Sequence, residues 1–240
     1  MKIIAHRGAS ADAPENTLAA MELALEQDAD AIELDVHCVE GELVVIHDRY
    51  LDHTTSGQGL VHNMTLAQLA TLDAGGGQRV PTLWQVMQCV AGRCDINIEL
   101  KGLGTADPLL PLLARAEQSL GFNPEQWLIS SFHHPMLAQV KQARPELKIG
   151  TLFAGCPLRY AEVASELNAH SVHLSANFLD AELLADSRRR GTKIYVYTVD
   201  RPDEVAEMIE LGVDGIFTNY PARTRALCHS QRLAPGKVWR

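Results

Sequence analysis

The chain has 240 residues, of which 46% are hydrophobic, 21% charged and 5% aromatic. This composition is that of an ordinary globular protein, and it excludes a disordered or low-complexity chain. The 21 basic and 30 acidic residues leave a formal net charge of −9, which disfavours nucleic acid as a partner. A small phosphate compound is still compatible with this charge, because a few local cations or a bound metal reverse the field inside one pocket.

The sequence has neither a secretion signal nor a membrane span that we can identify. Its N-terminal apolar run, Ile3-Ile4-Ala5, is far too short for a signal peptide, and no later run reaches the roughly 18 apolar residues of a spanning helix. The five cysteines form an odd set without a CxxC pair, so we expect neither a disulfide framework nor a thiolate zinc site. We therefore expect a cytoplasmic protein that does not insert into membranes.

Short β-rich runs alternate with longer amphipathic runs along the chain. Residues 2–5 and 31–35 form the first two β-rich runs, and residues 17–27 between them carry leucine and methionine at helical spacing. Six more β-rich runs follow, at residues 96–100, 128–131, 149–153, 171–175, 194–198 and 215–218. Segments long enough for crossover helices separate most of them, at residues 109–119, 136–143, 159–167, 181–190 and 202–211.

This alternation predicts an α/β fold, a (β/α)8 TIM barrel of eight parallel strands with helical returns. An open doubly wound sheet shows a similar alternation, but the glycine-rich fingerprints of its nucleotide-binding members are missing here. Residues 43–47 follow residues 31–36 too closely for a crossover, so we expect a β-hairpin with its turn near Glu40 and Gly41. The returning strand then brings His47 level with residues 33–35.

Three acidic residues stand on strands at positions that predict a shared inward face. Glu33 and Asp35 are two residues apart, so strand alternation places both on one side, and Glu99 ends a later strand. A divalent cation is the simplest compensation for their repulsion, and all-oxygen ligands favour Mg²⁺ or Ca²⁺ over zinc. The alternative is that each acid pairs with a lysine or arginine at the barrel rim.

Histidines and cations follow the ends of the same strands. His6 and Arg7 end the first strand, His47 ends the hairpin strand, and Lys101 follows Glu99. Two imidazoles titrating near neutrality can act as base and acid at a phosphorus centre, while Arg7 and Lys101 bind its oxygens. Each histidine taken alone is as compatible with a structural role, but catalytic groups of a TIM barrel gather where its strands end.

Seven short motifs run through the chain from residue 6 to residue 221. They are His6-Arg7-Gly8, Pro14-Glu15-Asn16-Thr17, Glu33-Leu34-Asp35-Val36, Val44-Val45-Ile46-His47-Asp48, Thr54-Thr55-Ser56-Gly57, Glu99-Leu100-Lys101 and Gly215-Ile216-Phe217-Thr218-Asn219-Tyr220-Pro221. In order and spacing this series resembles the glycerophosphodiester phosphodiesterase family, in its short cytoplasmic bacterial form.

The resemblance implies a fold, an activity and roles for residues. The fold is one domain over residues 1–240, a TIM barrel with a small insertion after the second strand, at about residues 47–81. The activity is hydrolysis of small glycerophosphodiesters to sn-glycerol 3-phosphate and an alcohol, with one divalent cation, Mg²⁺ or Ca²⁺. The family's pattern assigns metal binding to Glu33, Asp35 and Glu99, acid and base catalysis to His6 and His47, phosphate binding to Arg7 and Lys101, and supporting positions to Glu15 and Asp48.

Alternatives to this function remain open at the level of sequence. The nucleophile is either the neighbouring glycerol hydroxyl, which forms a cyclic phosphate, or a water molecule. Related barrels release cyclic phosphates or cleave lysophospholipids, as a lysophospholipase D does, and a non-catalytic protein that binds glycerophosphodiesters needs much the same pocket. The sequence indicates no oligomeric state.

Other histidines and the C-terminus have simpler interpretations. His133-His134-Pro135 is expected to be a loop or helix cap. His173 lies in a strand pattern and could line the pocket, but we expect an interior histidine whose polar atoms are paired. Tyr197 stands where the family often has tryptophan and His53 where it often has arginine, so substrate preference is less predictable than catalysis. Residues 237–240 are compatible with a docked tail or with an oligomer contact.

Overall fold

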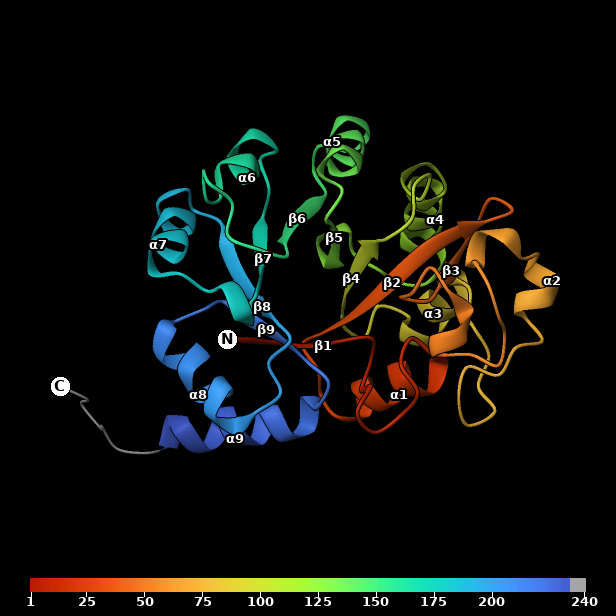
Figure 1. The fold of residues 1–240 in the computed structure, drawn as a ribbon, viewed down its shortest axis with the longest axis horizontal. Coiled ribbons are helices and arrows are strands. Elements are labelled where there is room, and N and C mark those ends of the chain that lie inside the picture. Colours follow the sequence, from red (N-terminus) through yellow and green to blue (C-terminus); the bar gives the residue numbers. More distant parts are fainter. Residues whose placement is uncertain (234–240) are drawn as a thin grey trace.

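Eight parallel strands close into a barrel with helices around its outside (Figure 1). The computed structural model describes residues 1–233. Within this range the strands pair in the order β1-β2-β4-β5-β6-β7-β8-β9, and β9 pairs back with β1. The barrel strands are β1 (Lys2–Ala5), β2 (Ala31–Val39), β4 (Asp95–Leu100), β5 (Trp127–Ser131), β6 (Lys148–Phe153), β7 (Ser171–Ser175), β8 (Lys193–Tyr197) and β9 (Gly215–Thr218). The predicted TIM barrel is confirmed.

The helices lie between successive strands and cover the barrel. They are α1 (Leu18–Glu26), α2 (Leu66–Leu69), α3 (Leu83–Val90), α4 (Ala106–Ser119), α5 (His134–Ala143), α6 (Glu162–Glu166), α7 (Ala181–Arg189), α8 (Pro202–Leu211) and α9 (Pro221–Leu233). Three of these helices, α2, α3 and α9, were not predicted from the sequence, although α2 and α3 each begin with a threonine whose side chain accepts from the third helical amide, at Thr65 and Thr82. None of the helices in residues 1–233 is long and apolar enough to cross a bilayer.

The expected hairpin joins β2 to the antiparallel strand β3 (Glu42–Val45). Its turn residues Glu40 and Gly41 have φ values of 50° and 85°, the left-handed conformation that a two-residue hairpin turn requires. Val36 lies opposite Val45, and the Ile46 amide donates to the Asp35 carbonyl at 3.0 Å. The chain therefore passes Asp35 as it leaves the hairpin, and His47 follows beside the acidic residues.

A small segment between β3 and α3 packs against the outer face of the hairpin. It contains two short 3-10 helices, Leu51–His53 and Val61–Asn63, and the single-turn helix α2. Its buried side chains form a cluster of their own with Val44 of β3 and with Ile46, which follows the end of that strand. This burial holds the start of the segment, where His47 and Asp48 lie, in a defined position against the barrel.

Strand alternation divides β2 and β4 into an outward apolar face and an inward polar one. Ile32, Leu34 and Val36 pack against the surrounding helices in the main hydrophobic core. Their neighbours Glu33 and Asp35 point into the barrel, and both are buried. The fold thus uses the outward residues for stability and leaves the inward ones for chemistry. The predicted tail or contact at residues 237–240 lies outside the described residues.

Candidate active site

A cavity of about 260 Å³ opens at the end of the barrel where the parallel strands finish. Its charged side comes from β1, β2, the hairpin and β4, and includes six of the residues predicted from sequence: His6, Arg7, Glu33, His47, Glu99 and Lys101. Its opposite side, from β5 to β9, contributes mainly Phe132, Leu152, Tyr197 and Phe217. The remaining predicted residues, Asp35, Glu15 and Asp48, contact members of the charged side. The structure therefore brings all nine together.

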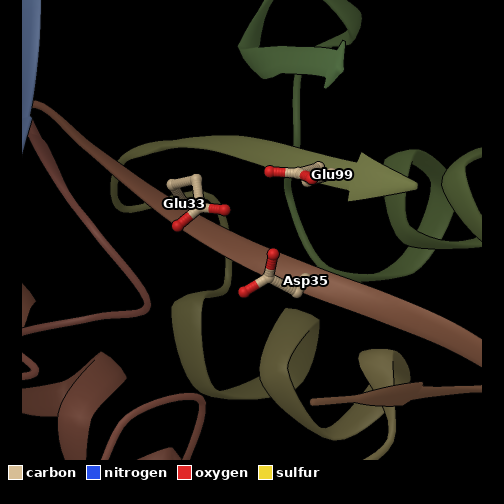
Figure 2. A group of neighbouring side chains, drawn as sticks. All are labelled: Glu33, Asp35 and Glu99. Carbon is tan, nitrogen blue, oxygen red and sulfur yellow. The ribbon is translucent and has the colours of Figure 1, made fainter. Parts of the chain in front are cut away.

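Three carboxylates face one another on the charged side (Figure 2). Glu33 and Asp35 project inward from β2, and Glu99 of β4 is the register partner of Asp35. One oxygen from each residue lies within 4.8 Å of the others, and all three side chains are buried. This proximity confirms the shared face predicted from strand alternation.

Burial and mutual repulsion perturb these acids. Both effects raise the pKa of Glu33 well above its ordinary value, and they raise that of Glu99 to about 7. Burial would also raise the pKa of Asp35, but the neighbouring cations Lys101 and Arg7 bring it below its usual range. Three ionised acids here would therefore carry more negative charge than Lys101 and Arg7 compensate.

The donor set fits a divalent cation better than the alternative of simple ion pairing. Lys101 Nζ lies 2.9 Å from Glu99 Oε1 and 3.8 Å from Asp35 Oδ1. Asp35 Oδ1 has no hydrogen-bond partner among the described residues, and Glu33 makes no ion pair with a lysine or arginine side chain there. Its Oε2 instead accepts from the Arg7 backbone amide at 2.9 Å. A hard cation is the group that three such oxygens suit.

Arg7 reaches the cavity because the chain turns sharply after β1. Arg7 itself has a φ of 58°, and Gly8 follows with a φ of 82°. A side chain at Gly8 would place its Cβ 2.7 Å from the backbone of Ala20, so only glycine fits this turn. The guanidinium is then held by Glu15, whose Oε1 accepts from Nη1 at 2.9 Å, and its Nε lies 3.5 Å from Asp35 Oδ2.

His6 is oriented by a chain of hydrogen bonds that the sequence analysis did not predict. Asp200 accepts from the Asn219 side-chain nitrogen at 2.7 Å and from its backbone amide at 2.8 Å. The Asn219 oxygen therefore faces His6, whose Nδ1 donates to it at 2.8 Å. Asn219 belongs to the C-terminal motif that runs from Gly215 to Pro221, but nothing in the sequence links it to His6.

This arrangement leaves Nε2 of His6 as the nitrogen with a free electron pair. Burial and the adjacent charge of Arg7 lower the pKa of His6 to about 4. The imidazole is thus neutral at ordinary pH and can accept a proton.

His47 is held from both sides. Asp48 Oδ1 accepts from Nδ1 of His47 at 2.8 Å, and Lys101 Nζ donates to Nε2 at 3.0 Å. The other Asp48 oxygen lies 2.8 Å from Nδ1 of His53, and these hydrogen bonds lower the pKa of Asp48 although burial acts in the opposite direction. Asp48 therefore fixes the hydrogen of His47 on Nδ1 and leaves Nε2 as the atom that faces Lys101.

The structure confirms the predicted role of His133 and shows that the prediction for His173 is partly wrong. His133 caps α5, where its side chain accepts from the Met136 amide, as predicted. His173 is fully buried, also as predicted, but only one of its ring nitrogens is paired, Nε2 with Ser171 Oγ at 2.9 Å. Nδ1 has no partner among the described residues, and the ring lines the cavity. Sequence alternation could show that His173 points inward but not that it reaches this depth of the site.

The buried His173 should make stability depend on pH. Burial lowers the pKa of His173 to about 3, whereas an unfolded histidine titrates near 6.5. Between these values the unfolded chain binds more protons, so this residue reduces stability as the pH falls. Urea denaturation measures this effect as the free energy of unfolding at pH 6.5 and at pH 5. Between these two pH values the wild type should lose about 1–2 kcal/mol more of this free energy than His173→Gln does. Identical pH dependences for the two proteins would contradict this expectation.

Comparisons with known proteins agree with the geometry. The glycerophosphoryl diester phosphodiesterase family model matches residues 6–223. A glycerophosphodiester phosphodiesterase of Caldanaerobacter subterraneus is 39% identical over 229 residues, covering 91% of this chain and 94% of its own. One from Bacillus altitudinis is 35% identical, covering 92% and 96%.

Solved structures show the same fold. A glycerophosphodiester phosphodiesterase from Agrobacterium tumefaciens superposes with a TM-score of 0.79 at 33% identity, covering 94% of this chain and 99% of its own. A phosphodiesterase from Oleispira antarctica, in complex with the product sn-glycerol-3-phosphate, has a TM-score of 0.87 at 28% identity and covers 95% and 97%. The chain therefore belongs to the glycerophosphoryl diester phosphodiesterase family.

Proposed function

We propose that this enzyme hydrolyses small glycerophosphodiesters to sn-glycerol 3-phosphate and an alcohol. The observation that carries the proposal is a cavity lined by two of the clustered carboxylates, two histidines and two cations, with the third carboxylate, Asp35, directly beside them. Family membership supports it, as does the product bound to the Oleispira antarctica relative. The cytoplasmic location expected from the sequence stays a prediction.

In this proposal Glu33, Asp35 and Glu99 hold one divalent cation, Mg²⁺ or Ca²⁺. The unpaired Asp35 oxygen and the raised pKa of Glu33 and of Glu99 support this assignment, since a cation relieves the repulsion among the three. When bound, the cation neutralises charge on the phosphoryl oxygens.

Arg7 and Lys101 bind the remaining phosphoryl oxygens. Glu15 and Asp35 fix the plane of the Arg7 guanidinium, which keeps further N–H groups free for a phosphate. Burial would lower the pKa of Lys101, but Glu99 and Asp35 keep it raised, so the ammonium stays charged. Both cations therefore act without any change in protonation.

His6 and His47 exchange protons with the substrate. His6 is the base, because Asn219 directs its free Nε2 electron pair and its lowered pKa keeps it neutral. His47 is the acid, because Asp48 accepts from its Nδ1 and so presents Nε2 to the departing alcohol, where it can carry a proton once Lys101 turns from Nε2 to the phosphoryl oxygens. His6 takes the proton of the attacking hydroxyl, from glycerol or from water, and His47 gives one to the departing alcohol.

Activity on glycerophosphocholine tests the proposal. We expect the purified protein with Mg²⁺ or Ca²⁺ to release sn-glycerol 3-phosphate and choline, and phosphorus NMR during turnover to reveal any cyclic phosphate that forms first. Tight binding of the diester by calorimetry, with no turnover under either metal, would instead indicate a non-catalytic binding protein.

Asp200 should affect catalysis through His6. Replacing it by alanine frees the Asn219 amide to rotate, so His6 loses the acceptor that selects its tautomer. We expect Asp200→Ala to lower kcat roughly 10- to 100-fold with little change in KM. The matched control is Asp203→Ala, which removes an exposed acid that pairs with Arg201 and should leave kcat unchanged. Equal kcat values for the two variants would exclude a positioning role for Asp200.

A further inference from the structure

The floor of the cavity presents two polar atoms that the protein does not satisfy. Asn97 and His173 both line the cavity, with 2% and 0% of their surface exposed. Oδ1 of Asn97 and Nδ1 of His173 have no hydrogen-bond partner in the part of the chain that the structure describes. Buried polar atoms are nearly always paired, so an unpaired pair beside a cavity indicates a ligand that supplies the missing contacts.

Neighbouring serines fix which atoms remain available. Asn97 Nδ2 donates to Ser130 Oγ at 2.9 Å, so its oxygen is the atom left over. Nε2 of His173 lies 2.9 Å from Ser171 Oγ, so Nδ1 is the nitrogen left over. Each side chain is therefore anchored at one end and free at the other.

The surroundings of His173 prevent it from finding another protein partner. Its ring centroid lies 5.5 Å from that of Tyr195 and 5.1 Å from that of Phe217. The ring also packs directly against Gly150. A Cβ at that position would lie 2.3 Å from Nε2 of His173, so any residue larger than glycine would collide with the imidazole. The ring is held in a built pocket rather than in a loose gap.

Strand register places Asn97 beside the carboxylates. Asn97 is the register partner of Glu33 and precedes Glu99 by two residues on the same face of β4. Two residues along a strand span about 6.6 Å, so Asn97 lies one such step down β4 from Glu99. A compact polyol attached to a phosphate at the mouth can reach this level.

We propose that Asn97 and His173 bind the glycerol hydroxyl that is farthest from the phosphorus. The hydroxyl donates to Asn97 Oδ1 and accepts from Nδ1–H of His173, while Nε2 of His173 accepts from Ser171. A hydroxyl is the smallest group that donates and accepts at once, and the apolar rings around His173 disfavour a charged one. This inference rests on the proposed function and names the part of the substrate that this floor selects.

A pair of substrates isolates that hydroxyl. Propane-1,2-diol 1-phosphocholine keeps the hydroxyl next to the phosphate and lacks only the far one. We expect wild type to prefer glycerophosphocholine by about 10²-fold or more in kcat/KM, because the analogue leaves buried polar atoms unpaired. Equal kcat/KM values for the two diesters would overturn the inference while leaving the proposed function intact.

Substitutions at His173 form a matched pair. His173→Gln keeps a polar group near Nε2 and loses the one at Nδ1, whereas His173→Asn does the opposite. We expect the preference for glycerophosphocholine over the analogue to fall to a few fold in His173→Gln and to be better retained in His173→Asn. Asn97→Leu removes the other proposed contact and should lower the same preference independently. Thermal melting verifies that each variant folds. An unchanged preference in both His173→Gln and Asn97→Leu would overturn the inference.

Direct binding separates this inference from catalysis. Calorimetry on wild type should find sn-glycerol 3-phosphate bound more tightly than propane-1,2-diol 1-phosphate, by about tenfold or more. If neither diester is hydrolysed, the proposed function fails, and this comparison still decides the role of the floor. Equal affinities for the two monoesters would mean that the floor binds only water.

Discussion

Removal of the divalent cation should lower diester hydrolysis by at least about 10³-fold, because neutralising phosphoryl charge is worth several kcal/mol. We expect dialysis against a chelator to abolish release of sn-glycerol 3-phosphate, and added Mg²⁺ or Ca²⁺ to restore it. The unfolding temperature should rise on addition of the same metal, since binding to the folded state alone stabilises it. That second measurement detects the site without relying on activity.

Single carboxylate substitutions locate the cation. Glu99→Gln removes one of the three proposed anionic ligands, so the metal concentration for half-maximal activity should rise by more than about tenfold. Asp95→Asn is the matched control, because Asp95 lies on the same strand but pairs with Lys2 at the opposite end of the barrel. It should leave the metal requirement unchanged. Full activity in chelator would exclude the proposed metal role of the three acids.

The two histidines should each contribute about 10²- to 10⁴-fold to kcat, the usual range for a general acid or base. We expect His6→Ala and His47→Ala to lose activity by that amount while still binding metal, because neither side chain belongs to the carboxylate cluster. His62→Ala is a suitable control, since His62 is exposed on the segment that follows the hairpin. Wild-type rates in either catalytic variant would reject its assigned role.

The pH profile distinguishes the two histidines. A base must be unprotonated, and burial with the Arg7 charge lowers the pKa of His6 to about 4, so kcat/KM should fall only as the pH approaches that value. We expect His6→Ala to lose this acidic limb and His47→Ala to retain it. The reverse pattern would exchange the two roles.

Local sequence patterns were sufficient for most of the fold because the barrel repeats one unit. Each strand is a short β-rich run and most crossovers show helical spacing, so the alternation predicted the parallel strands and the hairpin in between. The single-turn helix α2 was missed, since four residues are too few to show a helical period. The observed β3 is also shorter than predicted, because pairing stops at Val45 where the chain turns toward His47.

The sequence by itself determined that the candidate acids, histidines and cations would gather at one end of the barrel, because strand alternation and position at a strand end depend only on near neighbours in the chain. Only the tertiary structure decided how those groups are held. Several of the contacts that hold them join strands and loops far apart in sequence. These are the contacts of Asp200 with Asn219, of Asn219 with His6, and of Lys101 with His47. The depth of the cavity, and with it the unpaired atoms of Asn97 and His173, likewise depends on closing the barrel, since each inward side chain is enclosed by residues from other strands.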